Sequence, residues 1–347
     1  MAGKRRAPKR TSGARSRGAD VLPVAVIGAG PCGLAAAAAI ERAGTPCIVF
    51  DRGCIVSSIA SYPIYLTFFS TAEKIAIADV PFPLAAEKPT RRDALAYYRS
   101  VVTHLGLQVR QYEPVEAAQR RRSAFVLRSR PAGGDAVQTE AQAIVVATGY
   151  FGTPNAIGVP GEELPHVSHL YREGHGAFQR DVVVVGGGNS AAESALDLWR
   201  SGARVTLVHF GPTFDKNIKP WVLPDLRNRL DDGSINVRWN TRVTAIEPGR
   251  VHLEGDDGPG ILPAQHVFLM TGFTPNSELL ESLGVGVDAV SGIPTHDPRT
   301  METTVPGVYI AGVLASGFDA NKVFIENGRD HGALIAKALH RRRLERA

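Results

Sequence analysis

The stretch VAVIGAGPCGLAAAAAIERAGTPCIVFD, residues Val24 to Asp51, decides the fold of this chain. A short apolar run of β type leads into the turn GAGPCG, a helix-forming stretch follows, and a second apolar run ends in an acid. In such a turn Gly28 permits the tight bend, Gly30 leaves room for a pyrophosphate, and Gly33 lets the helix pack close to the strand. The helix start offers free N–H groups to phosphates, and Asp51 can accept hydrogen bonds from ribose hydroxyls. The stretch therefore predicts a dinucleotide site.

The same pattern returns at residues 181–210, DVVVVGGGNSAAESALDLWRSGARVTLVHF. Gly186, Gly188 and Ala191 repeat the three glycines of the first turn at a constant offset of 158 residues. Two complete crossovers in one chain are far more specific than one GxGxxG match, and they predict two nucleotides held by two domains. The fold class that we expect is α/β with two Rossmann-like dinucleotide-binding domains.

The two copies differ at the tip of the second strand. The first copy ends in Asp51, which suits a free ribose 2′-hydroxyl, whereas the second has His209 at the equivalent position. An acid at this tip repels a 2′-phosphate, and its absence permits one. We therefore assign FAD to the first site and NADPH, in preference to NADH, to the second. Four nearby cations could bind the 2′-phosphate: Arg204, His209, Lys216 and Lys219. Each of them could instead be an ordinary solvated surface charge.

Composition describes a soluble globular protein. The 347 residues suffice for about two domains, and 44% are hydrophobic and 21% charged. No apolar run approaches the roughly 20 residues that span a membrane. Three cysteines are too few and odd in number for a secreted disulfide framework, so we expect a cytoplasmic protein.

The net charge of +5 comes from the N-terminal tail. Residues 1–20 hold seven Lys or Arg and one Asp, and the remaining residues hold 32 basic and 33 acidic side chains, a net of −1. The tail has no aromatic residue and no apolar segment of the secretory type, so we expect it to be disordered. A solvated extension is the simpler interpretation, and contact with nucleic acid or anionic lipid through this tail is the alternative.

Aromatic side chains gather in the segment after Asp51, at residues 62–69. Segments in this position often lie over the bound ring system, and Tyr62, Tyr65, Phe68 and Phe69 could form its walls, although each is as readily a core residue. Further on, TRRDALAYYRSVVTHL, residues 90–105, predicts a helix with Thr90 as its N-cap.

The late run GVYIAG, residues 307–312, predicts a strand followed by a helix over 325–339. In flavoproteins with two dinucleotides such a C-terminal piece returns to the first domain and closes the flavin site. We therefore expect a discontinuous first domain. The predicted organisation is a basic tail at 1–20, an FAD domain at 21–155 and 285–347, and an NADPH domain at 156–284.

The two crossovers, the ATG and TG strand ends and the GVYIAG strand together resemble the two-domain flavoprotein disulfide reductases, thioredoxin reductase included, over residues 21–340. This chain departs from thioredoxin reductases because it has no CxxC pair, and Val313 stands where the wider family commonly has an Asp. A narrower resemblance, to the bacillithiol disulfide reductases, runs nearly end to end. It rests on these strings: GAGPCG, RGCIVSSI, SYP, TFFSTAEK, IADVPF, EKPTRRDALAYYR, IKPWVLP, MTGFTPN, METTVPGVYIAG and FIENGRDHG.

That resemblance implies an NADPH-dependent FAD enzyme that reduces the disulfide of a low-molecular-weight thiol, with Cys32 of GAGPCG as the redox residue. The helix start beside Cys32 favours a thiolate, and a bound pyrophosphate opposes it. Direct reduction by the flavin and a simple packing role for Cys32 stay open, while Cys47 and Cys54 are expected to be structural. The residues expected to contact the cofactors are Gly28, Gly30, Pro31, Cys32, Gly33, Asp51, Arg52, Thr67, Phe68, Phe69, Ser70, Thr148, Gly149, Gly186, Gly188, Asn189, Ser190, Ala191, Arg204, His209, Lys219, Gly272, Gly312, Lys322, Val323 and Phe324.

Three other functions are compatible with the same pattern. A ferredoxin or flavodoxin–NADP reductase shares this organisation and also lacks CxxC. A flavin monooxygenase typically carries FxGxxxHxxxY/F, and residues 164–171, LPHVSHLY, lack its leading Phe and Gly. A non-catalytic redox sensor would bind both cofactors without turnover. We expect no metal and no membrane partner, and symmetry statistics favour a homodimer.

Overall fold

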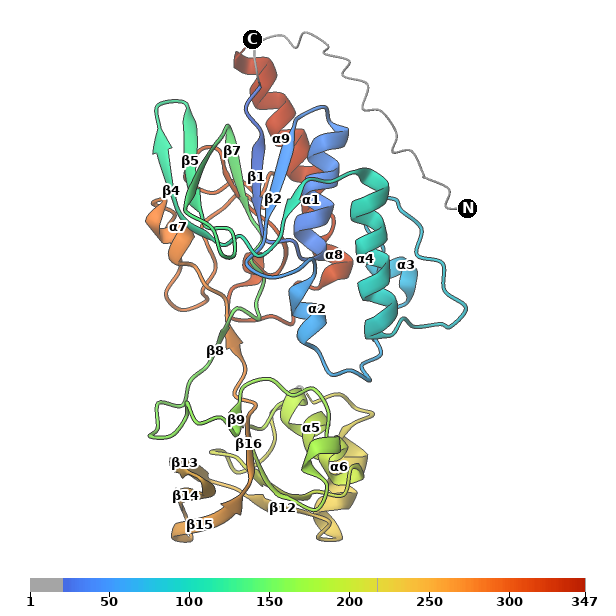
Figure 1. The fold of residues 1–347 in the computed structure, drawn as a ribbon, viewed down its shortest axis with the longest axis vertical. Coiled ribbons are helices and arrows are strands. Elements are labelled where there is room, and N and C mark those ends of the chain that lie inside the picture. Colours follow the sequence, from blue (N-terminus) through green and yellow to red (C-terminus); the bar gives the residue numbers. More distant parts are fainter. Residues whose placement is uncertain (1–20, 217, 347) are drawn as a thin grey trace, which may run out of the picture.

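The computed structural model describes residues 21–216 and 218–346. The prediction of a disordered tail falls on residues 1–20 and lies outside the described residues. The chain forms two α/β bodies, one above the other in Figure 1, which are joined by two adjacent extended connections. The two-Rossmann fold class is thereby confirmed.

A five-stranded parallel sheet forms the centre of the first body, in the order β18-β7-β1-β2-β3. Because β18 comes from the end of the chain and pairs with β7, the first body is discontinuous, as predicted. The strands of this sheet are β1 (Val24–Ile27), β2 (Cys47–Phe50), β3 (Val109–Arg110), β7 (Ala143–Val146) and β18 (Val308–Ile310).

Helices cover this sheet, and α1 packs against both α9 and α4. The predicted capping box at the start of α4 is present, because Thr90 Oγ1 accepts from the Asp93 N–H at 3.3 Å and Asp93 Oδ2 accepts from the Thr90 N–H at 2.9 Å. The helix predicted over 325–339 is two helices, because α8 ends at Gly328, a weak helix former. The helices of this body are α1 (Pro31–Arg42), α2 (Ser57–Ser61), α3 (Ala72–Ile75), α4 (Arg91–Leu105), α7 (Glu278–Ser282), α8 (Ile325–Gly328) and α9 (His331–Arg346), with a 3₁₀ turn at Gly312–Ser316.

A second five-stranded parallel sheet, in the order β12-β11-β10-β16-β9, forms the centre of the other body. Its strands are β9 (Val167–Ser168), β10 (Asp181–Val185), β11 (Arg204–Val208), β12 (Ile235–Arg238) and β16 (His266–Leu269). Helices α5 (Asn189–Arg200) and α6 (Leu223–Asp231) pack beside it, and a 3₁₀ turn spans His175–Ala177.

Each body also carries a three-stranded antiparallel sheet. The first is β4 (Val115–Arg121), β5 (Ala124–Ser129) and β6 (Val137–Ala141), and the second is β13 (Thr241–Glu247), β14 (Gly249–Gly255) and β15 (Gly258–Ala264). The two connections between the bodies pair with each other as β8 (Thr153–Pro154) and β17 (Phe273–Thr274).

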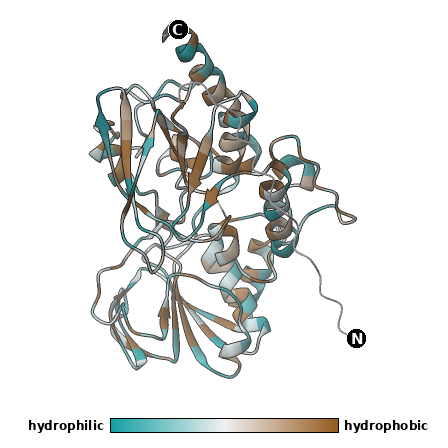
Figure 2. Cartoon of the chain, turned by 45° about the horizontal axis from the view of Figure 1, so that its top comes forward, coloured by the Kyte–Doolittle hydropathy of each residue, from teal (hydrophilic) through white to brown (hydrophobic). Residues whose placement is uncertain are grey.

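Hydrophobic residues concentrate in the central strands of both bodies (Figure 2). Leu280 and Val285 belong to the core of the first body. The predicted boundary at 284/285 therefore comes too late, because α7 packs against β4 and follows directly on the second connection. Burial of the apolar face of α7 decides its place, and residue spacing does not show which core it joins.

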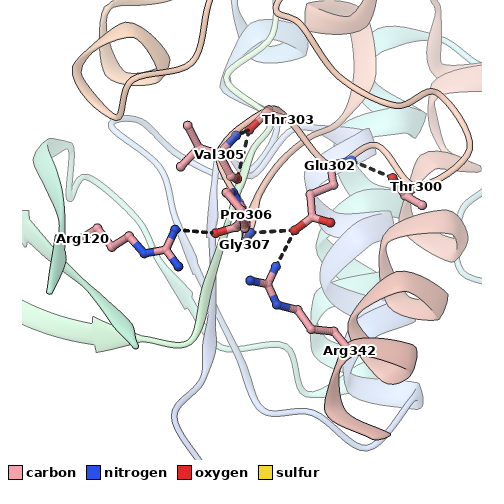
Figure 3. Close-up of polar contacts among 8 residues, drawn as sticks. All are labelled: Arg120, Thr300, Glu302, Thr303, Val305, Pro306, Gly307 and Arg342. Carbon is pink, nitrogen blue, oxygen red and sulfur yellow. Dashed lines mark hydrogen bonds and ion pairs between the residues drawn. The ribbon is translucent and has the colours of Figure 1, made fainter. Parts of the chain in front are cut away.

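A carboxylate fixes the loop that leads into β18 (Figure 3). Glu302 accepts from the Gly307 N–H at 2.7 Å and from the Arg342 guanidinium on α9. Arg120 on β4 donates to the Pro306 carbonyl at 3.2 Å. These contacts tie the returning strand to elements on both of its sides.

Within residues 21–216 and 218–346, no helix is both long and apolar enough to cross a membrane. The same residues contain no group of three or more His, Cys, Asp or Glu side chains placed to hold a metal ion.

Candidate functional site

The first glycine turn connects β1 to α1 and has the geometry of a phosphate cradle. Gly28 has a φ of +114°, and a Cβ there would lie 2.2 Å from the Ala147 carbonyl oxygen. A Cβ on Gly33 would lie 2.0 Å from the Gly28 oxygen, so α1 packs against the turn only with glycine there. At Gly30, by contrast, a Cβ would meet no atom within 4 Å. The turn is thus rigid underneath and open above.

The start of α1 leaves its N–H groups for a ligand. Its N-cap is Gly30, which provides no side-chain cap, and Pro31 at the first helical position lacks an N–H. Asp51 lies at the tip of β2 beside the turn, where its Oδ2 accepts from the Ala29 N–H at 2.7 Å and its Oδ1 from the Gly53 N–H at 2.7 Å. An open cradle, a bare helix start and an adjacent carboxylate fit the pyrophosphate and ribose of FAD.

The second turn, between β10 and α5, has the same glycine spacing, but it is less open, because a Cβ on Gly188 would lie 3.2 Å from the Asp215 Oδ2. Gly186 has a φ of +141°, and a Cβ there would lie 2.4 Å from the Met270 oxygen and 3.3 Å from the Ala191 Cβ. Gly188 caps α5 without a side-chain hydrogen bond. Asn189 Oδ1 accepts from the Lys219 N–H at 2.8 Å, and exposed Ser190 begins the helix beside it. The residues fit a second dinucleotide.

Two of the cations expected at this site, Arg204 and Lys219, are paired with carboxylates. Arg204 begins β11, at the opposite end of the strand from the glycine turn, and it is paired with Asp181 at 2.6 and 2.8 Å. The prediction for Arg204 is wrong, because parallel strands bring nucleotides to their carboxyl ends. Lys219 Nζ bonds Glu193 at 2.8 Å and lies 3.5 Å from the centre of the Phe69 ring.

His209 has the predicted position at the tip of β11, but it faces inward. The residue is 4% exposed, and a Cβ on Gly187 would lie 2.3 Å from its ring. The imidazole therefore packs beneath the turn and cannot reach outward to a phosphate. We correct its role from direct contact to support of the turn.

Cys32 points away from the open side of its turn. A Cβ on Gly312 would lie 3.1 Å from its Sγ, and one on Gly328 would lie 2.9 Å from it. Burial, followed by the charges of Glu326 and Asp330, raises the pKa of the Cys32 thiol to about 12. In this packing, desolvation and two carboxylates favour the neutral thiol and oppose the effect of the helix start.

The chain after β18 packs against Cys32. Gly312 begins the 3₁₀ turn after β18, and Val323 contacts Gly328 on the side of Cys32. Lys322 is exposed and paired with Asp319 at 3.3 Å. Thus Gly312 and Val323 gather around Cys32, whereas Lys322 points to solvent.

A cavity of about 700 Å³ opens where the predicted flavin segment meets α8. It is lined by Phe69, Ser70, Thr71, Lys74, Glu87, Lys88, Phe324, Glu326, Asn327 and Arg329. The Ser70 hydroxyl donates to Glu326, which joins the two walls. Phe69, Ser70 and Phe324 were predicted from the sequence. Glu326, Asn327 and Arg329 fall in the segment 321–329, which was expected to face the flavin. Lys74, Glu87 and Lys88 were missed because they lie in irregular chain and on the one-turn helix α3, where no periodicity marks a face.

A neighbouring cavity of about 380 Å³ lies between the two bodies and is lined by Thr67, Phe68, Phe69, Lys88 and Trp221. The Phe69 and Trp221 rings are 5.4 Å apart, centre to centre, across this junction. The predicted segment 67–70 therefore faces the second body.

The remaining predicted residues flank the connections between the bodies. Arg52 donates to the Gly152 carbonyl at 3.1 Å, just beyond Thr148 and Gly149, and Gly272 accepts from the Asn155 N–H at 3.0 Å.

Together the two cradles and the apolar junction define a flavoprotein oxidoreductase with two dinucleotides.

Comparisons with known proteins agree with this class. The family model for pyridine nucleotide-disulphide oxidoreductases matches residues 25–312. The bacilliredoxin reductase Bdr of Bacillus subtilis is 41% identical over 319 residues, which cover 91% of this chain and 97% of the relative. The chain belongs to the pyridine nucleotide-disulphide oxidoreductase family.

Solved structures lead to the same conclusion. The bacillithiol disulfide reductase Bdr from Bacillus cereus superposes with a TM-score of 0.90 at 41% identity, covering 93% of this chain and 100% of the other. The protein of that title from Staphylococcus aureus gives 0.87 at 37% identity, covering 93% and 99%. The chain is therefore a flavin-dependent disulfide oxidoreductase that uses FAD and NAD(P)H.

Proposed function

We propose that this enzyme uses NADPH to reduce the disulfide of a low-molecular-weight thiol, with bacillithiol disulfide as the leading substrate. The overall reaction consumes one NADPH, one proton and one disulfide, and it yields NADP⁺ and two thiols. The observation that carries the proposal is the near full-length similarity to proteins named for bacillithiol disulfide and bacilliredoxin reduction.

The 700 Å³ cavity supports a small substrate. Lys74 and Lys88 are exposed on its lining, and Glu87 is the exposed acid beside them. The third cation, Arg329, is engaged through Nη1 with the carbonyls of Glu73 and Ala76. The two lysines favour a disulfide that carries carboxylates.

FAD, when bound at the first turn, supplies the hydride acceptor and the electron donor of this chemistry. The turn residues would hold its pyrophosphate, and Asp51 would accept from its ribose. Phe69 and Trp221 contact each other across the junction between the bodies. The chain itself contributes orientation, electrostatics and the enclosed cavity.

Cys32 remains our proposed redox residue. Burial favours its neutral thiol, so nucleophilic attack on a disulfide first requires loss of the thiol proton. Without that step the disulfide is reduced by the flavin directly. Turnover by Cys32→Ala, measured against wild type, separates the two routes.

The test is an acceptor panel. FAD-loaded protein and NADPH are mixed without oxygen, and bacillithiol disulfide, glutathione disulfide, ferredoxin and flavodoxin are added separately. The proposal expects turnover with bacillithiol disulfide above all. Turnover with ferredoxin or flavodoxin alone would replace it by a ferredoxin–NADP reductase function, and flavin reduction without any turnover would indicate a sensor. A cytoplasmic location and a homodimer stay predictions that fractionation and light scattering test.

A further inference from the structure

Three of the four cations predicted for the 2′-phosphate do not face the tip of β11, and the fourth, Lys216, is exposed next to Asp215 at the second turn. NADPH differs from NADH only by its 2′-phosphate, and in this type of crossover the ribose lies at the tip of the second strand. His209 is buried there, Arg204 is at the other end, and Lys219 faces Glu193 and Phe69.

Two other arginines reach this tip from the neighbouring strands. Residues 240 and 241 bond directly to the tip, since the Asn240 N–H donates to the Gly211 carbonyl and the Thr241 N–H to the His209 carbonyl, each at 3.0 Å. On the same side, the His209 N–H donates to the Arg238 carbonyl at 3.0 Å, so residues 238–241 run along one side of the tip. Arg238 is the last residue of β12, and Arg242 is the second residue of β13.

An exposed aromatic ring holds one of these guanidinium groups. Phe210 follows His209 and is 62% exposed. The Arg242 guanidinium carbon lies 4.9 Å from the centre of this ring, within cation–π range. Exposure of a large apolar ring to water is unfavourable, so such a ring at a ligand-binding edge suggests a role. Here the Phe210 ring orients the Arg242 guanidinium over the place where the ribose is expected.

The carboxylate directly opposite Arg242 on β14 is that of exposed Glu254, which forms no ion pair with it. Among the described residues, no carboxylate lies within salt-bridge distance of Arg242. Arg238 lies 3.8 Å from Asp257, whose side chain is 93% exposed, so the pair is weak and easily exchanged. Asp256 is occupied by the Asn240 amide at 2.7 Å.

We propose that Arg242, seated on Phe210 and assisted by Arg238, binds the 2′-phosphate and selects NADPH. The inference rests on the NADPH preference in the proposed function and names the residues that produce it. Guanidinium groups suit this role, because they bond phosphate oxygens in a planar fork that lysine lacks.

Nucleotide fragments test this without any turnover. Binding of adenosine 2′,5′-bisphosphate and of 5′-AMP to the FAD-loaded protein is measured by calorimetry. We expect wild type to bind the bisphosphate at least about tenfold more tightly than AMP. Arg242→Ala should weaken the bisphosphate by about tenfold or more and leave AMP unchanged, and added salt should weaken the wild-type preference.

Two further variants complete the design. Arg250→Ala is the matched control, since Arg250 is exposed at the far end of the β13–β14 hairpin and pairs with Glu247 at 2.7 Å. It should match wild type. Arg242→Lys should keep part of the preference, which separates lost charge from lost folding. Unchanged AMP binding confirms that the second body of each variant is folded.

Three results would overturn the inference. Wild type could bind both nucleotides equally, Arg242→Ala together with Arg238→Ala could keep full preference, or AMP binding could fall as much as bisphosphate binding. If Arg242→Ala abolishes the preference for the bisphosphate, the inference is supported whether or not the enzyme reduces a disulfide. Failure of the inference can therefore be told apart from failure of the proposed disulfide substrate.

Discussion

Two alanine substitutions in one turn should have opposite consequences. Gly30→Ala places a methyl group where no atom lies within 4 Å, on a backbone with a φ of −71° that alanine adopts readily. Its folding cost is the poorer N-cap, about 0.5–1 kcal/mol. The new methyl occupies the space of the pyrophosphate, so FAD affinity should fall by about tenfold or more, equivalent to about 1.4 kcal/mol.

Gly33→Ala instead puts a Cβ 2.0 Å from the Gly28 oxygen. Carbon and oxygen normally approach to about 3.3 Å, so α1 must retreat by roughly 1 Å. Overpacking of this kind costs about 1–3 kcal/mol and lowers the melting temperature by several degrees. The variant should lose stability and FAD together.

The assay pairs FAD titration of flavin-stripped protein with thermal melting. Gly260→Ala is the control, because its Cβ meets nothing within 4 Å and the residue is exposed on β15. If Gly30→Ala retained wild-type FAD affinity while folded, the first turn would not be the pyrophosphate site, and the reasoning from the open cradle would be refuted.

Three further outcomes are expected. The pKa of the Cys32 thiol is raised to about 12, so the thiol should stay protonated near neutral pH. Its alkylation in flavin-stripped protein, followed by mass spectrometry, should rise with pH up to about that value and at pH 7.5 should be slower than that of free cysteine by a factor on the order of 10³. Half-maximal labelling below pH 9 would contradict this. Glu302→Ala removes acceptors from Gly307 and Arg342 and should cost about 1–3 kcal/mol in urea unfolding, whereas exposed Glu254→Ala should not. Lys88→Gln should raise KM about twofold to fivefold for a carboxylate-bearing disulfide and leave kcat and a neutral disulfide unaffected; equal effects on both substrates would remove the lysine from substrate binding.

Local patterns were sufficient to predict the two crossovers. Each glycine turn is defined by contacts within about 30 residues or to the adjacent strand, so its spacing is visible in the sequence. The return of β18 was also predictable, because a buried strand of this length must join a sheet.

Which side chains meet at the two turns depends on tertiary packing, which the sequence patterns do not show. Arg204 is five residues from His209 along β11, and at about 3.3 Å per residue the two lie roughly 16 Å apart, at opposite edges. The raised pKa of the Cys32 thiol comes from burial and then from the charges of Glu326 and Asp330, nearly 300 residues away. Arg242 reaches the same tip through the pairing of β11 with its neighbours, which spacing within one crossover does not reveal.

The most direct test of the central claim is the stoichiometry of thiol production. FAD-loaded protein, NADPH and bacillithiol disulfide are incubated without oxygen, and NADPH loss and free thiol are followed together. The account predicts two thiols for each NADPH consumed, with neither change in the absence of enzyme. NADPH consumption without thiol formation, or no consumption at all by a protein whose flavin is reduced by NADPH, would contradict it.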